Sequence, residues 1–258
     1  MKHLRIFNSA AEFEAAKPNL DELFVVLNEE NGGMVYSNLP TISEDDLTED
    51  DYVDLGLPSG LLWATRNIGA EKPCDYGKYF QWGATVGYTT EAEANANSSW
   101  ETAPFNGGKS KYNEDVFAAV SGTACPNGVL AAEYDAAYQA TNGAYRMPTS
   151  GECQELIDNT NHTWCTCEIL GHSDHTFVNG CLFTSKTDET KKLFIPAAGH
   201  FSNGSFEKGG SYGYVWSSSL YSSYPYSARN LYFYSSDMRD SNSIRSFCQS
   251  VRGVKNKA

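Results

Sequence analysis

Three short stretches near the C-terminal end constrain the fold of this chain more than any other feature. They are residues 214–219, 231–234 and 250–254, and each carries apolar side chains at every second position. This alternation is the period of a β-strand that buries one face. We therefore interpret the segment 212–254 as a framework of strands.

The residues between these stretches show neither a helical nor a strand period, and few of them are aliphatic. Seven of the tyrosines of the chain fall between residues 212 and 234. Tyrosine gives a large contact area for two side-chain torsions, and serine and asparagine add adaptable hydrogen bonds, as in antibody paratopes. The segment is thus predicted to be a contact surface rather than a reaction centre. On composition alone, a Tyr- and Ser-rich loop of an ordinary β-rich domain is the alternative. The residues expected on the surface are Tyr221, Tyr224, Tyr226, Ser227, Asn230, Arg239, Ser241, Asn242, Ser243 and Ser246.

The composition limits the class of protein. At 258 residues, with 41% hydrophobic and 13% aromatic residues, the chain is long and apolar enough for one large or two unequal folded domains. No window is apolar enough for a membrane span, and the N-terminal sequence lacks the apolar stretch of a signal peptide. A net charge of −13 argues against nucleic-acid binding. Without an export signal, the seven cysteines are expected to be reduced thiols.

The first 51 residues divide into a small module and an acidic stretch. In residues 1–42 we expect a strand at 4–7, a helix opened by a capping box at 9–12, and a hairpin turning at Asn31 and Gly32. This module is too small to be stable alone, which favours a docking or oligomerisation role. Residues 43–51 carry six acids and no base, and self-repulsion predicts an extended linker. A calcium loop is rejected because the glycine turn and the spaced terminal Glu are missing.

Residues 52–258 are expected to form one globular domain. A hairpin at 52–64, an aromatic strand at 75–83 and strands at 163–169, 178–184 and 193–197 alternate with a long surface insertion at 85–128 and a helix at 131–140. A capping box from Thr149 to Glu152 opens a second helix, 152–159, whose residues Cys153, Leu156 and Ile157 share one face. The predicted class is α+β, with short antiparallel strands, two helices and a long insertion.

Six motifs occur in an order that resembles a known family. Together they are similar to the Bacteroidetes domain named after the Fibrobacter succinogenes major paralogous proteins, which implies a C-type lectin-like fold over about residues 52–254. The chain departs from the common pattern at Tyr145 and at Cys153, and both are expected to be core substitutions. The motifs are 52–60 with 62–64, then 76–77 with 80–83, then 145–149, 195–199, 213–218 and 250–254.

The final segment further resembles the variable proteins of diversity-generating retroelements, in which a reverse transcriptase rewrites adenines of a template repeat while framing residues stay fixed. The resemblance implies a fixed frame of Trp216, Ser217, Ser218, Leu231, Phe233, Arg245 and residues 250–254. It implies diversified, ligand-binding positions at Tyr221, Tyr224, Tyr226, Ser227, Asn230, Tyr232, Tyr234, Arg239, Ser241, Asn242, Ser243, Ile244, Ser246 and Phe247.

The N-terminal module resembles segments at the start of structural proteins of gut phages that infect Bacteroides. Without a signal peptide or a lipoprotein Cys, the expected protein is a receptor-binding protein of a Bacteroides phage or prophage, made in the bacterial cytoplasm and located on the virion, at the phage tail or surface. The expected partners are a host cell-surface protein or glycan and, through the N-terminal module, structural proteins of the virion. A homo-oligomer is compatible with this role, and neither nucleic-acid binding nor membrane insertion is expected. The alternative is a Bacteroidetes surface adhesin or glycan-binding module without a retroelement.

No motif predicts catalysis, a cofactor or a metal site. Cys165 and Cys167 with His172 and His175 are the best metal candidate, but one residue between the cysteines is fewer than structural zinc sites use. Residues 107–110 end like a phosphate-binding loop that lacks its first glycine and its preceding strand. The C-type lectin fold also hosts formylglycine-generating enzymes, which use paired cysteines near the C-terminus, whereas Cys248 stands alone there. We therefore predict a binding protein.

Overall fold

The computed structural model divides the chain into two compact units, Met1–Thr41 and Ile42–Ala258. No helix in the part that the structure describes is long and apolar enough to cross a membrane. The described residues are 4–7, 23–26, 34–36, 39–48, 50–111, 124–169 and 176–257.

The first unit contains a three-stranded sheet in the order β1-β2-β3. β1 (Leu4–Phe7) pairs in parallel with β2 (Leu23–Val26), which pairs antiparallel with β3 (Met34–Tyr36). The three strands lie where the apolar runs of the sequence predict them. The predicted capping box at 9–12, its helix, and the turn at Asn31 and Gly32 lie outside the described residues.

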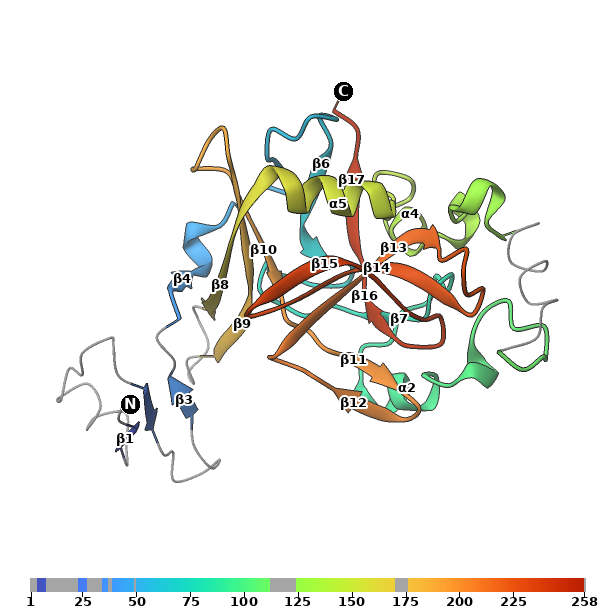
Figure 1. Cartoon of the computed structure of the whole chain (residues 1–258), viewed down its shortest axis with the longest axis horizontal. Helices are drawn as coiled ribbons and strands as arrows, with labels where there is room; N and C mark the ends of the chain where they lie inside the picture. Colours follow the sequence, from blue (N-terminus) through green and yellow to red (C-terminus); the bar gives the residue numbers. More distant parts are fainter. Residues whose placement is uncertain are drawn as a thin grey trace. The chain divides into compact units, whose positions relative to one another are not determined.

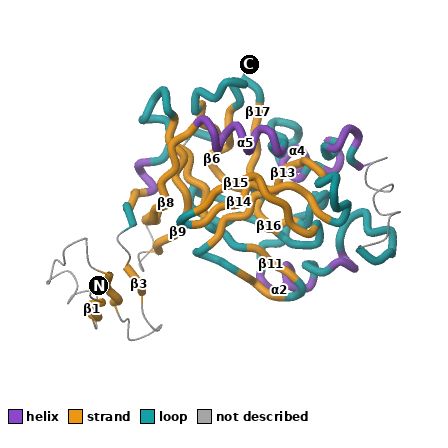
Figure 2. The backbone as a smooth tube through the Cα atoms, in the orientation of Figure 1, coloured by secondary structure: helices purple, strands orange, loops and turns teal. Residues whose placement is uncertain are grey.

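The second unit is mixed α+β and is built mostly of sheet (Figures 1 and 2). Its sheets have the strand orders β15-β14-β13-β16-β7, β10-β9-β8-β4, β17-β6-β5 and β11-β12. The predicted α+β class is confirmed at this level. The strands are β4 (Thr41–Ser43), β5 (Tyr52–Asp54), β6 (Leu62–Asn67), β7 (Tyr79–Phe80), β8 (Thr160–Ile169), β9 (Thr176–Ser185), β10 (Lys192–Pro196), β11 (His200–Ser202), β12 (Ser205–Glu207), β13 (Tyr212–Leu220), β14 (Ser227–Tyr234), β15 (Asp237–Ile244), β16 (Gln249–Ser250) and β17 (Arg252–Lys255).

Three α-helices occur in the described part of this unit, against the two predicted. They are α2 (Glu91–Ala96), α4 (Ala136–Ala140) and α5 (Ser150–Asn159). The capping box that opens α5 is confirmed, because the Thr149 side chain accepts from the Glu152 amide and the Glu152 carboxylate accepts from the Thr149 amide. α5 packs against β13, β14 and β15 (Figure 1), and it buries Cys153 and Leu156 as its apolar pattern predicts.

The predicted framework side chains form the core. Trp63, Leu231 and Phe233 belong to one buried cluster, and Trp82 and Trp216 belong to a second. The indole N–H of Trp216 donates to the Phe80 carbonyl oxygen at 2.8 Å, and that of Trp82 donates to the Ser217 carbonyl oxygen at the same distance. These bonds satisfy the polar atoms of two fully buried rings, which would otherwise oppose their burial.

The acidic stretch 43–51 is not an extended linker where the structure describes it. Ser43 caps a short 3-10 helix, Glu44–Asp46, and Leu47 is buried in an apolar cluster. The Glu44 carboxylate lies 2.9 Å from the Lys72 ammonium. Acids that cap a helix or pair with a cation lose much of their mutual repulsion, so this segment folds as part of the second unit.

Two segments expected to be irregular contain regular structure. Residues 237–244 form β15, the edge strand beside β14, because backbone pairing on the edge of a sheet needs no apolar side chains. The insertion 85–128 contains α2, opened by a capping box from Thr90 to Glu93, while its residues 112–123 lie outside the described part. The expected helix at 131–140 is divided by Asp135, whose side chain caps α4.

A disulfide joins Cys74 to Cys167, 93 residues apart, so the expectation of fully reduced cysteines is wrong. Tertiary folding brings the turn before β7 beside β8, which sequence spacing does not reveal. Cys165, two residues before Cys167, is a buried free thiol.

Candidate binding surface

The β13–β14 hairpin places four tyrosines on one face of the five-stranded sheet. Tyr212 pairs in register with Tyr234, and Tyr214 pairs with Tyr232. Successive side chains of a strand point to opposite faces, so these four rings share a side. The intervening residues Val215, Leu231 and Phe233 point to the other side, where they are buried in the core.

The four rings form a continuous aromatic layer. We call this layer, together with Arg239, the tyrosine face. The ring centroids of Tyr212 and Tyr234 are 5.1 Å apart, and those of Tyr214 and Tyr232 are 5.2 Å apart. Tyr212 and Tyr232 link the two pairs at 5.8 Å. Contacts at this spacing hold the rings in place. No hydroxyl group of the four makes a hydrogen bond within the described residues, so the hydroxyls are free to bind a partner.

Two cations flank the layer. The Arg239 guanidinium lies 5.0 Å from the ring centroid of Tyr232 and 2.7 Å from the Asp237 carboxylate. The Lys208 ammonium lies 5.4 Å from the ring centroid of Tyr212. Cations at this distance are attracted by the aromatic faces.

His200 of β11 supports the inner edge of the tyrosine face. Its ring lies 4.7 Å from Tyr214 and stacks at 5.1 Å on Phe247. Burial lowers the pKa of His200, and the Glu207 carboxylate, 4.0 Å away, opposes this shift. Burial also raises the pKa of Tyr214 to about 12, so this phenol remains a neutral hydrogen-bond donor at physiological pH.

A second group of rings, which we call the tyrosine loop, lies at the opposite end of the same hairpin. It joins Leu220 of β13 to Ser227 of β14 and contains Tyr221, Tyr224 and Tyr226. Consecutive rings are 5.6 Å apart in both pairs, and Tyr224 is 51% exposed. The Arg229 guanidinium lies 4.4 Å from the Tyr221 ring. The predicted tyrosine surface therefore consists of two separate clusters.

Three positions predicted to face a ligand are buried instead. Ser227, Asn230 and Ser246 are 3%, 0% and 2% exposed. The Asn230 amide donates to the side chains of Ser243 and Gln249, at 2.9 Å each. Asn230 pairs with Trp216 on β13, so its side chain points into the part of the sheet that Gln249 and Trp216 occupy.

The remaining predicted positions reach the surface to different extents. Arg239 and Asn242 are exposed, as is Tyr224. The partly exposed ones are Tyr221, Tyr226, Tyr232, Tyr234, Ser241, Ser243, Ile244 and Phe247.

The predicted ligand-binding positions omit Tyr212, Tyr214, Lys208 and His200. The two tyrosines carry a signal, since they repeat the spacing of Tyr232 and Tyr234, and pairing the two runs as a hairpin would have found them. Lys208 and His200 carry none, because only tertiary packing places them beside the hairpin.

Every residue of the implied fixed frame is buried. Ser217, Ser218 and Arg245 are at most 1% exposed, although they are polar. The Arg245 guanidinium donates to the carbonyl oxygens of Pro225 and Pro104 at 2.9 Å each. This residue thus ties the tyrosine loop to the insertion.

The metal candidate of the sequence does not assemble from the described residues. Cys167 is bonded to Cys74, and Cys165 is buried in an apolar cluster, while His172 and His175 lie outside the described part. No group of three or more His, Cys, Asp or Glu able to hold a metal occurs among the described residues.

Comparisons of the chain with protein-family models, curated proteins and solved structures give no match.

Proposed function

We propose that this protein is a receptor-binding protein that presents the tyrosine face on a C-type lectin-like scaffold. The observation that carries the proposal is the division of β13 and β14 into two faces. One face packs into the core through Val215, Leu231 and Phe233. The other face is buried at Trp216 and Asn230, and beyond them it holds four tyrosines whose hydroxyls make no hydrogen bond within the described residues. Rings that are already ordered lose little entropy when a partner binds.

We further propose that the chain is a variable protein of a diversity-generating retroelement. This hypothesis is supported by the burial of every residue of the implied frame, among them Trp216 and Val254. Diversified positions such as Tyr232 and Arg239 are, in contrast, partly or fully exposed. Substitutions at exposed positions usually change the free energy of unfolding by less than about 0.5 kcal/mol, so such a surface tolerates diversification. At Ser227, Asn230 and Ser246 the same argument predicts that fewer substitutions are tolerated than at exposed positions, because these side chains are buried.

Attachment to a host cell by a phage particle fits this surface. A protein contact of standard size buries about 800 Å² on each partner, with a few Tyr or Arg residues carrying most of the energy. Several copies on one particle would convert weak contacts into firm attachment by raising the effective concentration. The Cys74–Cys167 disulfide is typical of a protein that functions outside a reducing cytosol, such as on a released virion or on a cell surface.

Attachment of the labelled protein to Bacteroides cells tests this function. The triple variant Tyr232→Ala, Tyr234→Ala and Arg239→Ala should lose attachment and keep a melting temperature close to that of the unmodified protein. The matched control is Tyr52→Ala with Tyr138→Ala, which removes two exposed tyrosines outside both clusters, 41% and 39% exposed. Unchanged attachment of the triple variant, or equal loss in the control, would refute the proposal.

A further inference from the structure

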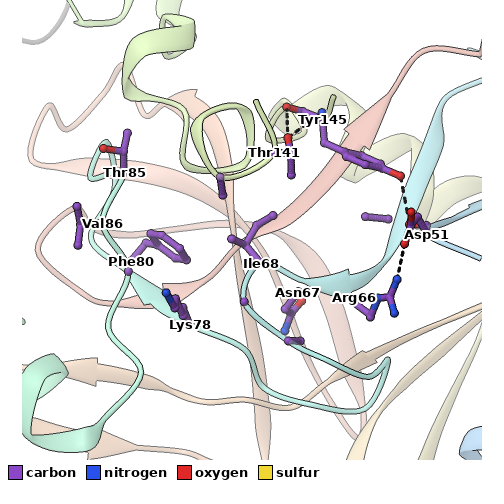
Figure 3. A pocket seen from close by; sticks show the side chains of 15 residues that line it. Asp51, Arg66, Asn67, Ile68, Lys78, Phe80, Thr85, Val86, Thr141 and Tyr145 are labelled. Carbon is purple, nitrogen blue, oxygen red and sulfur yellow. Dashed lines mark hydrogen bonds and ion pairs between the residues drawn. The ribbon is translucent and has the colours of Figure 1, made fainter. Parts of the chain in front are cut away.

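A cavity of about 670 Å³ lies in the second unit and is lined by no residue of the tyrosine face or of the tyrosine loop. Its walls come from Ala64 and residues 66–70 of β6 and the following turn, from Lys78, Phe80 and residues 85–87, and from the end of α4 (Figure 3). Tyr145 and Asp51 complete one side (Figure 3). Cavities of this size accommodate small molecules or single side chains of a partner.

One part of the cavity is apolar. Ile68, Phe80 and Val86 line it, and Val86 is 72% exposed. The Phe80 ring lies directly against the backbone of Gly87, where an added Cβ would be 2.4 Å from Cζ of the ring. Val86 offers contact area that an apolar ligand group would cover, while Phe80, which is 2% exposed, forms the packed wall behind it.

Lys78 supplies an unpaired cation beside this apolar part. Its amide N–H donates to the Ile68 carbonyl oxygen at 2.9 Å, and its side-chain stem lies on Gly69, where a Cβ would approach Cγ of Lys78 to 2.6 Å. Within the described residues the ammonium makes no hydrogen bond or ion pair. The Glu93 carboxylate attracts this ammonium without forming an ion pair with it within the described residues, and it accepts hydrogen bonds from the amides of Thr89 and Thr90.

The other charged groups of the cavity are already engaged. Arg66 pairs with the Asp51 carboxylate and donates to the Glu71 carbonyl oxygen at 3.3 Å. The Tyr145 hydroxyl donates to the Asp51 carbonyl oxygen, also at 3.3 Å (Figure 3). Lys78 is therefore the cation of this cavity that is left to receive an anion from outside.

We infer that the cavity binds a carboxylate that carries an apolar group, with the carboxylate at the Lys78 ammonium and the apolar group against Ile68, Phe80 and Val86. A charge-assisted hydrogen bond to an ammonium is stronger than a neutral one, and the apolar wall adds burial of hydrocarbon. Two sources share this chemistry: a free organic acid, and the C-terminal residue of a peptide from a partner protein. The inference does not depend on the proposed receptor-binding function.

Titration calorimetry with four probes tests the inference on the full chain. The probes are 3-phenylpropionate, its neutral counterpart 3-phenylpropanol, the peptide acetyl-Ala-Ala-Phe with a free C-terminus, and the same peptide as its amide. At least one carboxylate probe should bind about tenfold or more tightly than its neutral counterpart. The neutral probe lacks the carboxylate and therefore loses the charge-assisted hydrogen bond to Lys78. Tighter binding of the free acid identifies a small-molecule site, and tighter binding of the peptide identifies a peptide C-terminus.

Three variants assign any binding to this cavity. Lys78→Met keeps the side-chain stem and should weaken binding of the carboxylate probe by about tenfold or more. Val86→Glu places a repelling charge at an exposed position and should also weaken binding of this probe. Lys208→Met, which removes a cation at the tyrosine face, should leave the affinity unchanged. Absence of carboxylate binding, equal binding of the neutral probes, or full affinity in Lys78→Met would overturn the inference.

Discussion

The side-chain amide of Asn230 donates a hydrogen bond of 2.9 Å to the hydroxyl of Ser243 on the neighbouring strand, and Asn230 itself is fully buried. Two residues further along β14, Tyr232 lies on the tyrosine face with an arginine over its ring. A single strand thus combines a structural polar contact with a surface available to a partner.

We predict that Asn230→Ala lowers the free energy of unfolding by about 1–3 kcal/mol, because it leaves the buried side-chain oxygen of Gln249 without its donor. Chemical denaturation measures this change. Asn242→Ala is the matched control, since Asn242 is exposed on β15, and its effect should stay within about 0.5 kcal/mol. Equal effects of the two substitutions would show that Asn230 has no structural role.

The tyrosine loop is predicted to act independently of the tyrosine face. Tyr224→Ala should leave the melting temperature nearly unchanged, because this ring is 51% exposed. Tyr221→Ala should cost about 0.5–1 kcal/mol of stability, because it removes the ring that faces Arg229. In a double-mutant cycle, substitutions at Tyr221 and Tyr232 should have additive effects on the free energy of unfolding. A coupling energy well above about 0.5 kcal/mol would mean that the two clusters act as one.

The disulfide predicts a defined thiol count. The unfolded protein without reductant should react at five cysteines, since Cys125, Cys153, Cys165, Cys181 and Cys248 are free, and at all seven after reduction. Mass spectrometry after alkylation gives the count. Cys74→Ser should lower the free energy of unfolding by about 2–5 kcal/mol under oxidising conditions, since it opens a loop of 93 residues. Seven reactive thiols without reductant would contradict the bond.

His200 is predicted to make stability depend on pH. Because burial lowers its pKa in the folded state, the unfolded chain binds a proton more readily than the folded one. Stability is therefore retained above the ordinary histidine pKa of 6.5 and falls as the pH drops from 6.5 through the lowered value. Denaturation at a series of pH values should show a shallower fall in His200→Phe, which keeps a ring beside Tyr214 and Phe247. An identical fall in both proteins would assign the dependence to other groups.

The sequence alone determined much of the scaffold. The alternation of Val215 and of Leu231 with Phe233 predicts buried strands, and the Thr149–Glu152 capping box predicts α5, because both signals are local. These signals led to the α+β class and to the buried tryptophans.

Tertiary structure decided the rest of the candidate site. Asn230 and Tyr232 lie on the same face of β14, so whether each can meet a partner depends on what covers that part of the face, and β15 and Gln249 are placed by pairing rather than by their own composition. The Cys74–Cys167 bond and the position of His200 beside Tyr214 likewise join residues far apart in the chain. Local pattern fixes which side chains share a face of a strand, whereas long-range packing fixes which part of each face is buried.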